Sequence, residues 1–125
     1  MTDDAVMSLR DIVPTLERWQ KGIADEDVDL IASAFTETAL FQGLGPEPVF
    51  GREGVRGYYG SQPDPLTVEY EVLRFVPIGE QAAVAYLKAV FHPRGRDPRP
   101  TYLTLVFHRV REAWLIEHYH VSLIA

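Results

Sequence analysis

Histidines near the end of the chain are the first candidates for chemistry. His118 and His120 are two residues apart in a stretch that alternates like a β-strand, so their imidazoles should share one face. Strand residues at this spacing can bind a metal, and His108 could supply a third nitrogen. No carboxylate motif completes such a site, and a His pair alone imposes no metal geometry. We therefore predict no metal and no cofactor, and expect these histidines to hydrogen-bond within a sheet or at a subunit contact.

Aromatic side chains could form the wall of a ligand site. Trp19, Phe41, Tyr58 and Tyr59 all fall in the first half of the chain. Aromatic residues at helical or strand spacing usually belong to a core. Two interpretations remain open, core packing and contact with an apolar ligand.

Three arginines cluster in a segment that is rich in proline and glycine. Arg94, Arg96 and Arg99 lie within residues 92–100. A solvated hairpin tip is the usual role of such a loop. A loop that gates anions is the alternative.

The residues that must position these side chains are helical in the first third of the chain. Apolar residues recur there at spacings of three and four, which predicts an amphipathic helix with the stripe Leu9, Ile12, Leu16, Trp19 and Ile23. With Asp11 as the N-cap, Pro14 falls in the first turn, where its missing N–H does no harm. Residues 1–10 are then irregular or form a separate short turn.

A second, short helix is expected to follow, with Gly22 ending the first helix and residues 25–27 capping the next. Its buried stripe is predicted to be Leu30, Ile31, Ala34 and Phe35. A short strand is predicted at 39–42 and a third, weak helix at 51–60. Gly54 and Gly57 each cost that helix about 1 kcal/mol, and indicate either fraying or close approach to a neighbouring element.

From Leu66 onward the apolar period changes to two, which predicts strands. The phase flips at Val72-Leu73, which indicates a β-bulge that bends the first long strand. Further strands are expected at 81–91, about 101–110 and about 114–124. Helices followed by antiparallel strands predict an α+β domain, in which a bent sheet wraps around helices on one face and leaves a conical cavity.

The bulk composition limits the class of partner. The chain has 125 residues, enough for a single domain over residues 1–125, and a net charge of −6. This charge argues against nucleic acid and against an anionic membrane surface as partners. No apolar run approaches the roughly 20 residues that span a bilayer. The acidic N-terminus lacks a basic signal-peptide region, so we expect a cytoplasmic protein.

The closing hairpin resembles that of a known superfamily. The last strand of this hairpin follows closely after Val106-Phe107-His108-Arg109. Every second residue of the strand lies on one face, which consists of Trp114, Ile116, His118, His120 and Ser122. This pattern is similar to the nuclear transport factor 2-like superfamily, above all to the association domain of calcium/calmodulin-dependent protein kinase II and to SnoaL-like proteins. The resemblance implies a cone-shaped fold with three N-terminal helices packed on a strongly curved mixed, mainly antiparallel β-sheet.

Ketosteroid isomerase, an enzyme of this superfamily, uses a basic Asp, a Tyr and a protonated Asp. The resemblance places these three positions at Gly43, at Trp19, and at Thr104 or Leu105. Without a carboxylate there is no general base, so this isomerase reaction is not expected. The aromatic wall of that family is retained in kind as Tyr58 and Tyr59.

Comparison with the kinase association domain suggests which residues face the cavity. Of its three carboxylate-binding arginines, one resembles Lys88 in charge, and the others fall at Leu105 and Val121. The same comparison directs Glu117, Tyr119 and Val121 into the cavity. It implies that Lys88 and Glu117 pair there as a polar anchor or as acid and base; the alternative is that both are solvated near strand ends.

We therefore predict small-molecule binding in a hydrophobic cavity on the order of several hundred Å³, with proton-transfer catalysis left open. The expected ligand is apolar or bears a carbonyl or carboxylate group. The predicted ligand-binding residues are Trp19, Phe41, Tyr58, Tyr59, Lys88, Leu105, Glu117 and Tyr119. The alternative is a non-catalytic homo-oligomerisation or accessory domain. A homodimer is expected in either case, through an apolar face formed by Leu87, Ala89, Phe91, Trp114 and Ile116.

Overall fold

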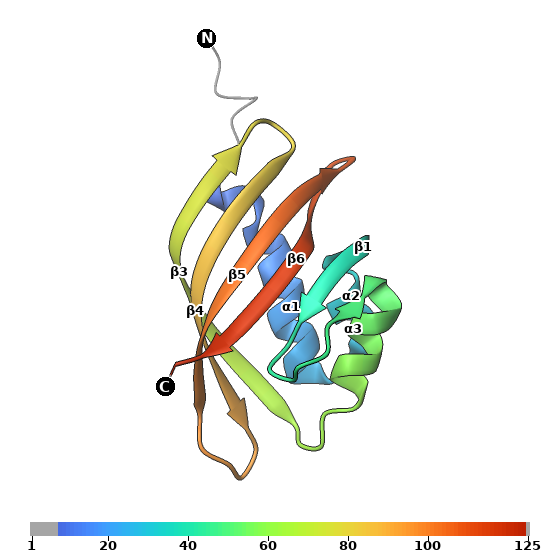
Figure 1. The fold of residues 1–125 in the computed structure, drawn as a ribbon, viewed down its shortest axis with the longest axis vertical. Helices are drawn as coiled ribbons and strands as arrows, with labels where there is room; N and C mark the ends of the chain where they lie inside the picture. The colour runs from blue at the N-terminus through green and yellow to red at the C-terminus, as the bar shows by residue number, and fades with distance from the viewer. Residues whose placement is uncertain (1–7, 125) are drawn as a thin grey trace.

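A six-stranded sheet forms one layer of the part of the chain that the structure describes, residues 8–124 of a computed structural model (Figure 1). The strands are β1 Phe35–Gln42, β2 Val49–Phe50, β3 Leu66–Ile78, β4 Ala82–Pro93, β5 Arg99–Val110 and β6 Ala113–Leu123. Their order across the sheet is β2-β1-β6-β5-β4-β3. β1 and β6 are parallel, whereas every other neighbouring pair is antiparallel. The sheet is thus mixed and mainly antiparallel, as predicted.

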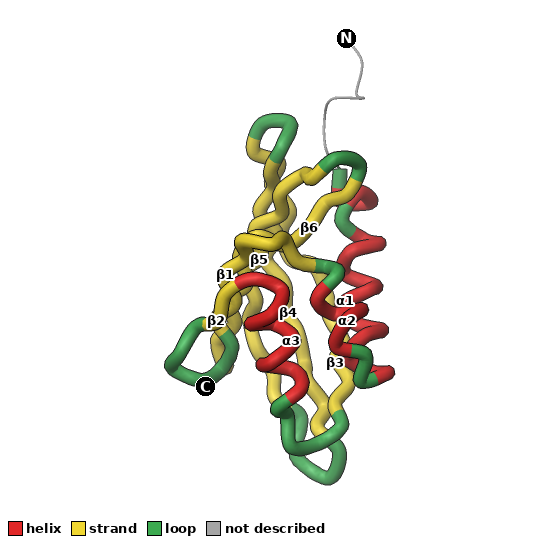
Figure 2. The backbone as a smooth tube through the Cα atoms, turned by 90° about the vertical axis from the view of Figure 1, so that its right-hand side faces the viewer, coloured by secondary structure: helices red, strands yellow, loops and turns green. Residues whose placement is uncertain are grey.

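Helices cover one side of this sheet (Figure 2). They are a short 3-10 turn, η1 Leu9–Asp11, and the α-helices α1 Val13–Asp25, α2 Val28–Ala32 and α3 Gly51–Gly60. This arrangement confirms the predicted α+β fold, with three helices packed on a sheet. Among residues 8–124, none of the helices has the length and apolar character that crossing a bilayer requires.

α1 begins where proline is tolerated. Val13 and Pro14 are its first two residues, so the missing N–H of Pro14 falls where the helix has no internal acceptor. The prediction of Asp11 as N-cap is wrong, because the Asp11 carboxylate accepts a hydrogen bond from the Ser8 backbone N–H at 2.8 Å and closes η1. Ile12 is the N-cap residue instead. Residues 1–7 of the predicted irregular segment lie outside the described residues.

The junction between α1 and α2 corrects the expected role of Gly22. This residue lies inside α1, which continues to Asp25 and ends at Glu26 in the left-handed conformation, with φ 55°. A Cβ at Gly22 would lie 2.6 Å from Ile31 Cγ1, so the glycine permits close approach of the two helices. Asp27 caps α2 as predicted, since its carboxylate accepts from the Leu30 N–H at 3.0 Å.

α2 is shorter, and β1 longer, than the apolar pattern predicts. The helix ends at Ala32, so Ala34 and Phe35 lie outside it. Phe35 is fully buried as the first residue of β1. Its backbone pairs with Ile116 of β6, and this parallel pairing explains why the strand begins before residue 39.

Two irregularities bend the long strands. The first lies between Val72 and Arg74 of β3, which confirms the bulge predicted at this phase flip. The second lies between Val106 and Phe107 of β5 and was not predicted from the sequence. Phe107 pairs with Ile116 and Val106 with His118, so Glu117 is the extra residue of β6.

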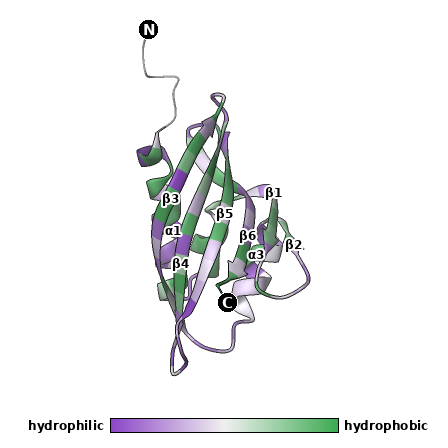
Figure 3. Ribbon diagram, turned by 60° about the vertical axis from the view of Figure 1, so that its left-hand side comes forward, coloured by the Kyte–Doolittle hydropathy of each residue, from purple (hydrophilic) through white to green (hydrophobic). Residues whose placement is uncertain are grey.

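The two faces of β4 are opposite to those expected. Leu87 and Ala89 are fully buried beneath the helices, whereas Tyr86 and Lys88 are exposed on the outer face. Figure 3 shows the hydropathy of β3, β4 and β5, in which hydrophobic stretches are interrupted by hydrophilic residues. The predicted dimer face is therefore wrong, because Leu87, Ala89, Phe91 and Ile116 all belong to the core and Trp114 is packed against it.

Candidate functional site

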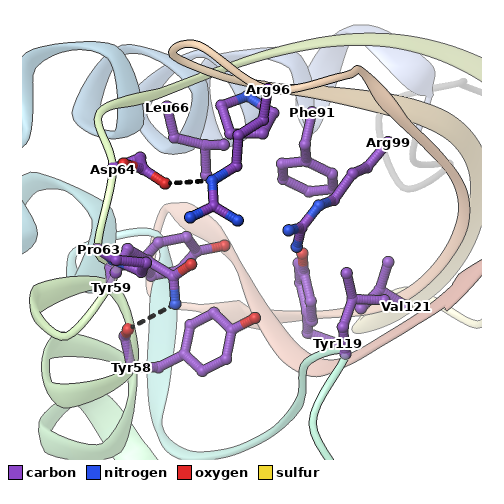
Figure 4. A pocket seen from close by; sticks show the side chains of 13 residues that line it. Tyr58, Tyr59, Pro63, Asp64, Leu66, Phe91, Arg96, Arg99, Tyr119 and Val121 are labelled. Carbon is purple, nitrogen blue, oxygen red and sulfur yellow. Dashed lines mark hydrogen bonds and ion pairs between the residues drawn. The ribbon is translucent and has the colours of Figure 1, made fainter.

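A cavity of about 100 Å³ opens where the end of α3, the β4–β5 hairpin and the end of β6 meet (Figure 4). Its lining residues are Leu44, Tyr58, Tyr59, Gln62, Pro63, Asp64, Leu66, Phe91, Pro93, Arg96, Arg99, Tyr119 and Val121. It is smaller than the several hundred Å³ predicted. Large side chains, among them Trp19, Phe41 and Leu105, are fully buried and fill the interior behind it.

Stacked aromatic rings form the floor of the cavity. The ring of Tyr119 lies parallel to that of Phe41, with centroids 4.1 Å apart and an interplanar angle of 12°. Tyr58 packs on Phe41 at 4.6 Å and meets Tyr59 edge-on at 5.2 Å. Each ring is thus held by at least one other, which keeps the floor in a single arrangement.

Polar groups of the floor are joined in a hydrogen-bonded cluster. Trp19 Nε1 donates to the hydroxyl oxygen of Tyr59 at 3.0 Å. The hydroxyls of Tyr59 and Tyr119 lie close enough for each to influence the pKa of the other. Burial raises the pKa of both tyrosines above the usual 10.0. Both therefore remain neutral hydroxyls at physiological pH.

The rim of the cavity carries charge. Arg96 Nε lies 2.8 Å from Asp64 Oδ2, and Arg99 lines the same cavity from the first residue of β5. Figure 4 shows the terminal nitrogens of both guanidinium groups directed toward the space above the rings of Tyr58 and Tyr119. The cavity therefore combines an aromatic floor with a cationic rim.

Backbone and side-chain contacts hold the rim in place. The Arg94 N–H donates to the Pro65 carbonyl oxygen at 2.9 Å. Together with the Arg96–Asp64 pair, this bond links the β4–β5 hairpin to the α3–β3 connection. Pro63 and Pro65 on either side of Asp64 restrict the backbone of that connection.

The predicted site residues fall into three groups. Tyr58, Tyr59 and Tyr119 line the cavity. Trp19, Phe41 and Leu105 are buried behind it. Lys88 and Glu117 are elsewhere.

The predicted orientation of Lys88 is wrong, because its side chain lies on the outer face of β4 and not on the cavity side. It points outward from β4, opposite Tyr102, and is exposed. Its inward neighbours in the strand are Leu87 and Ala89, which are fully buried. Lys88 therefore does not reach the cavity.

The predicted position of Glu117 is wrong because of the β5–β6 bulge. Its carboxylate oxygens accept hydrogen bonds from Thr36 Oγ1 and Thr38 Oγ1, each at 2.8 Å. His108 Nδ1 lies 3.9 Å from the same carboxylate. Glu117 thus belongs to a separate depression beside β1, lined also by Arg52, and does not pair with Lys88.

Several cavity residues were missed from the sequence. Asp64 and Leu66 gave no signal beyond a proline-rich turn, and Phe91 was expected on the outer face. Arg96 and Arg99 were noticed, but their default interpretation was a solvated loop. An arginine pair followed by a strand is a weak sequence signal, and only the fold brings it over the tyrosines.

Gly43, the position at which the resemblance places the isomerase base, has no room for a side chain. It is buried, and a Cβ there would lie 2.5 Å from Cε1 and 2.6 Å from the hydroxyl oxygen of Tyr58. The ring of Tyr58 therefore fills the space that a side chain at position 43 would need.

The histidine pair lies away from the cavity. His118 and His120 are on the outer side of β6, with ring centroids 6.3 Å apart. Within residues 8–124, no cluster of three or more His, Cys, Asp or Glu side chains has the geometry to hold a metal ion.

The curved sheet, the covering helices and the aromatic hollow define a cone-shaped α+β domain of the nuclear transport factor 2-like superfamily, which confirms the resemblance seen in the closing hairpin. Residues 12–125 match the SnoaL-like domain family, and the chain belongs to that family.

Solved structures of proteins with different names share this fold. A ketosteroid isomerase-like protein from Erwinia carotovora atroseptica is 14% identical, with a TM-score of 0.79 and coverage of 94% of this chain and 96% of that one. Hexachlorocyclohexane dehydrochlorinase type 3 from Novosphingobium barchaimii is 13% identical, with a TM-score of 0.81 and coverage of 93% and 86%. A candidate calcium/calmodulin-dependent protein kinase type II association domain from Thiobacillus denitrificans is 12% identical, with a TM-score of 0.74 and coverage of 89% and 93%.

At these identities the likeness shows the fold alone. A comparison with curated proteins found no match.

Proposed function

We propose that the chain binds a small organic molecule in the cavity between α3, the β4–β5 hairpin and β6. The observation that carries this proposal is the combination of a rigid aromatic floor with polar groups that converge on one space. Tyr58, Tyr59 and Tyr119 supply apolar surface and hydroxyls, while Arg96 and Arg99 supply charge. Small-molecule sites are typically apolar hollows into which a small number of polar groups converge.

The size of the cavity limits the ligand. Sites for drug-sized molecules usually have about 300 Å³ or more, whereas this cavity has about 100 Å³. A single small ring with one polar substituent suits this space better than a steroid or another fused-ring molecule. Its ring would lie on Tyr58 and Tyr119, with the substituent toward the arginines.

The lining residues support catalysis less well than binding. Two structural relatives carry the names of an isomerase-like protein and a dehydrochlorinase. A general base needs a free lone pair within reach of the ligand. Among the lining residues Asp64 is the carboxylate, and its Oδ2 is engaged by Arg96. Position 43 is glycine. Binding is therefore the better supported role.

Filling the cavity tests this proposal. Val121 is 5% exposed and lines the hollow, so Val121→Phe should occupy the ligand's space. We expect benzamide and benzoate, titrated by calorimetry, to lose about tenfold or more in affinity, which is about 1.4 kcal/mol. Val106→Phe, the same change on the outer side of β5, is the control and should bind like the parent protein.

Two results would count against the proposal. One is that neither probe binds the parent protein. The other is that the folded Val121→Phe variant binds both probes as the parent does, which would place any binding outside the cavity.

A second candidate function is self-association. Tyr86 and Tyr102 stack on the outer face of β4 and β5 at 5.4 Å, and each is 38% exposed. Exposed, mutually ordered aromatic side chains on a sheet face are typical of a surface that a second copy can cover. One structural relative carries the name of an association domain. This role is compatible with ligand binding because the cavity opens elsewhere.

A further inference from the structure

We propose that the rim formed by Arg96 and Arg99 is a monocarboxylate site, so that the preferred ligand is a small ring bearing one carboxylate group. The inference rests on the proposed function and specifies the ligand class that the cavity takes. Its anchor is different from the one that the sequence suggested, because Lys88 lies on the opposite face of the sheet.

The first argument is the hydrogen-bonding state of the two guanidinium groups. Arg96 uses its Nε for Asp64, at 2.8 Å, and its terminal nitrogens point into the cavity. Within residues 8–124, Arg99 takes part in no side-chain hydrogen bond or ion pair that meets the usual distance limits. Terminal N–H groups of arginine form a planar fork that matches the two oxygens of a carboxylate.

The second argument is the charge at the rim. Two guanidinium groups face one carboxylate, that of Asp64, so the rim retains one positive charge, although the whole chain has a net charge of −6. A ligand with one negative charge neutralises this rim. A phosphate dianion would leave an excess negative charge next to Asp64, which favours a carboxylate over a phosphate.

The third argument is the floor. Tyr58 and Tyr119 present ring surfaces and hydroxyls to the same space. A flat ring can stack there while its carboxylate reaches the arginines, and the Tyr119 hydroxyl stays neutral because burial raises its pKa. An inorganic anion would leave the aromatic surface uncovered.

Asp64 then acts as a positioning residue. Its bond to Nε fixes the guanidinium plane of Arg96 while leaving the terminal nitrogens available. The Arg94–Pro65 backbone bond holds the loop that carries Arg96 at the cavity. The rim is thus arranged before a ligand arrives, which lowers the entropy that binding must overcome.

The test compares benzoate with its neutral isostere benzamide, using calorimetric titration of the full chain at low salt. We expect the parent protein to prefer benzoate by about tenfold. Arg99→Gln and Arg96→Gln should each reduce benzoate affinity by most of that factor and leave benzamide affinity unchanged. Arg94→Gln removes a charge from the same loop without touching the cavity lining, and should retain the preference.

Arg96→Lys separates geometry from charge, because it keeps the cation but loses the fork. We expect an affinity for benzoate between those of the parent and Arg96→Gln. Inorganic phosphate should not compete with benzoate at concentrations near the dissociation constant of benzoate.

The failures of the two proposals are distinguishable. Equal binding of benzoate and benzamide, both abolished by Val121→Phe, would overturn the carboxylate site and leave the cavity function standing. Effective competition by phosphate, or an equal loss in Arg94→Gln, would also overturn it. Absence of binding by both probes would overturn both proposals.

Discussion

Tyr59 is the residue that organises the floor of the cavity. Its hydroxyl accepts the Trp19 indole N–H at 3.0 Å and lies close to the hydroxyl of Tyr119. Trp19 is fully buried, so Tyr59 supplies the partner that its indole N–H would otherwise lack. One hydroxyl thereby connects α1, α3 and β6 at the point where the ligand is proposed to bind.

Removing this hydroxyl should destabilise the fold. In Tyr59→Phe the ring remains, but the Trp19 N–H loses its acceptor in a buried place. We expect the free energy of unfolding, measured by urea denaturation, to fall by about 1–3 kcal/mol. Tyr86→Phe removes a hydroxyl from the exposed outer face and should change it by less than about 0.5 kcal/mol. Equal effects of the two substitutions would show that the Trp19–Tyr59 bond contributes little.

At the scale of elements, the contact between α1 and α2 depends on a glycine. A Cβ at Gly22 would lie 2.6 Å from Ile31 Cγ1 and 2.9 Å from the backbone N of Ile31. The backbone atom cannot be displaced without moving α2. From the sequence, this glycine was predicted to end the helix, although its role is close packing.

Gly22→Ala should therefore destabilise the protein despite the higher helix propensity of alanine. We expect a loss of about 1–3 kcal/mol in the free energy of unfolding, because the two helices must separate. The matched control is Gly57→Ala in α3, where an added Cβ meets nothing within 4 Å. There the helix propensity should act alone and add about 0.5–1 kcal/mol. A gain in both variants would contradict the assigned role of Gly22.

The elements also show how far the sequence predicted the structure. The helices and every strand except the two-residue β2 were predicted from the sequence, and the phase flip at Val72-Leu73 correctly indicated a bulge. Leu115 and Ile116 are likewise adjacent and apolar, and this second flip, at the β5–β6 bulge, was missed. Because this bulge was missed, Glu117 was predicted on the wrong face of the sheet.

Strand phase was the other source of error. β4 is almost uniformly apolar, so alternation could not show which face is buried, and Lys88 was assigned by resemblance alone. Tyr58 and Tyr59 were found through the resemblance, which placed them on the aromatic wall of the cavity. Asp64 could not be grouped with Arg96 and Arg99 from the sequence, because the pairing of β3 with β4 and the packing of α3 bring it to them.

At the scale of the whole molecule, the cavity and the outer sheet face are separate surfaces. The helices cover the inner face of the sheet, and the outer face of β4 and β5 carries the Tyr86–Tyr102 stack (Figures 1 and 2). A homodimer through the outer face would leave the rim of the cavity accessible. Ligand binding and self-association are therefore independent in this account.

Tyr86→Asp should weaken a dimer that forms through this face, because association would bury an unpaired charge. We expect a shift toward monomer in sedimentation velocity, at a concentration where the parent protein is dimeric. Pro46→Asp places the same charge in the exposed β1–β2 loop and should sediment like the parent. A parent protein that is monomeric at high concentration, or an unchanged Tyr86→Asp dimer, would contradict the interface.

The most direct test of the cavity function is methyl NMR of the parent protein during titration with benzoate. We expect saturable shifts of the methyl signals of Val121 and Leu66, which line the cavity, together with nuclear Overhauser contacts between benzoate protons and the ring of Tyr58 or Tyr119. The methyl signals of Val84 and Val106 on the outer face should stay in place. Shifts confined to those two residues, or no saturable shift at Val121, would contradict ligand binding in the hollow.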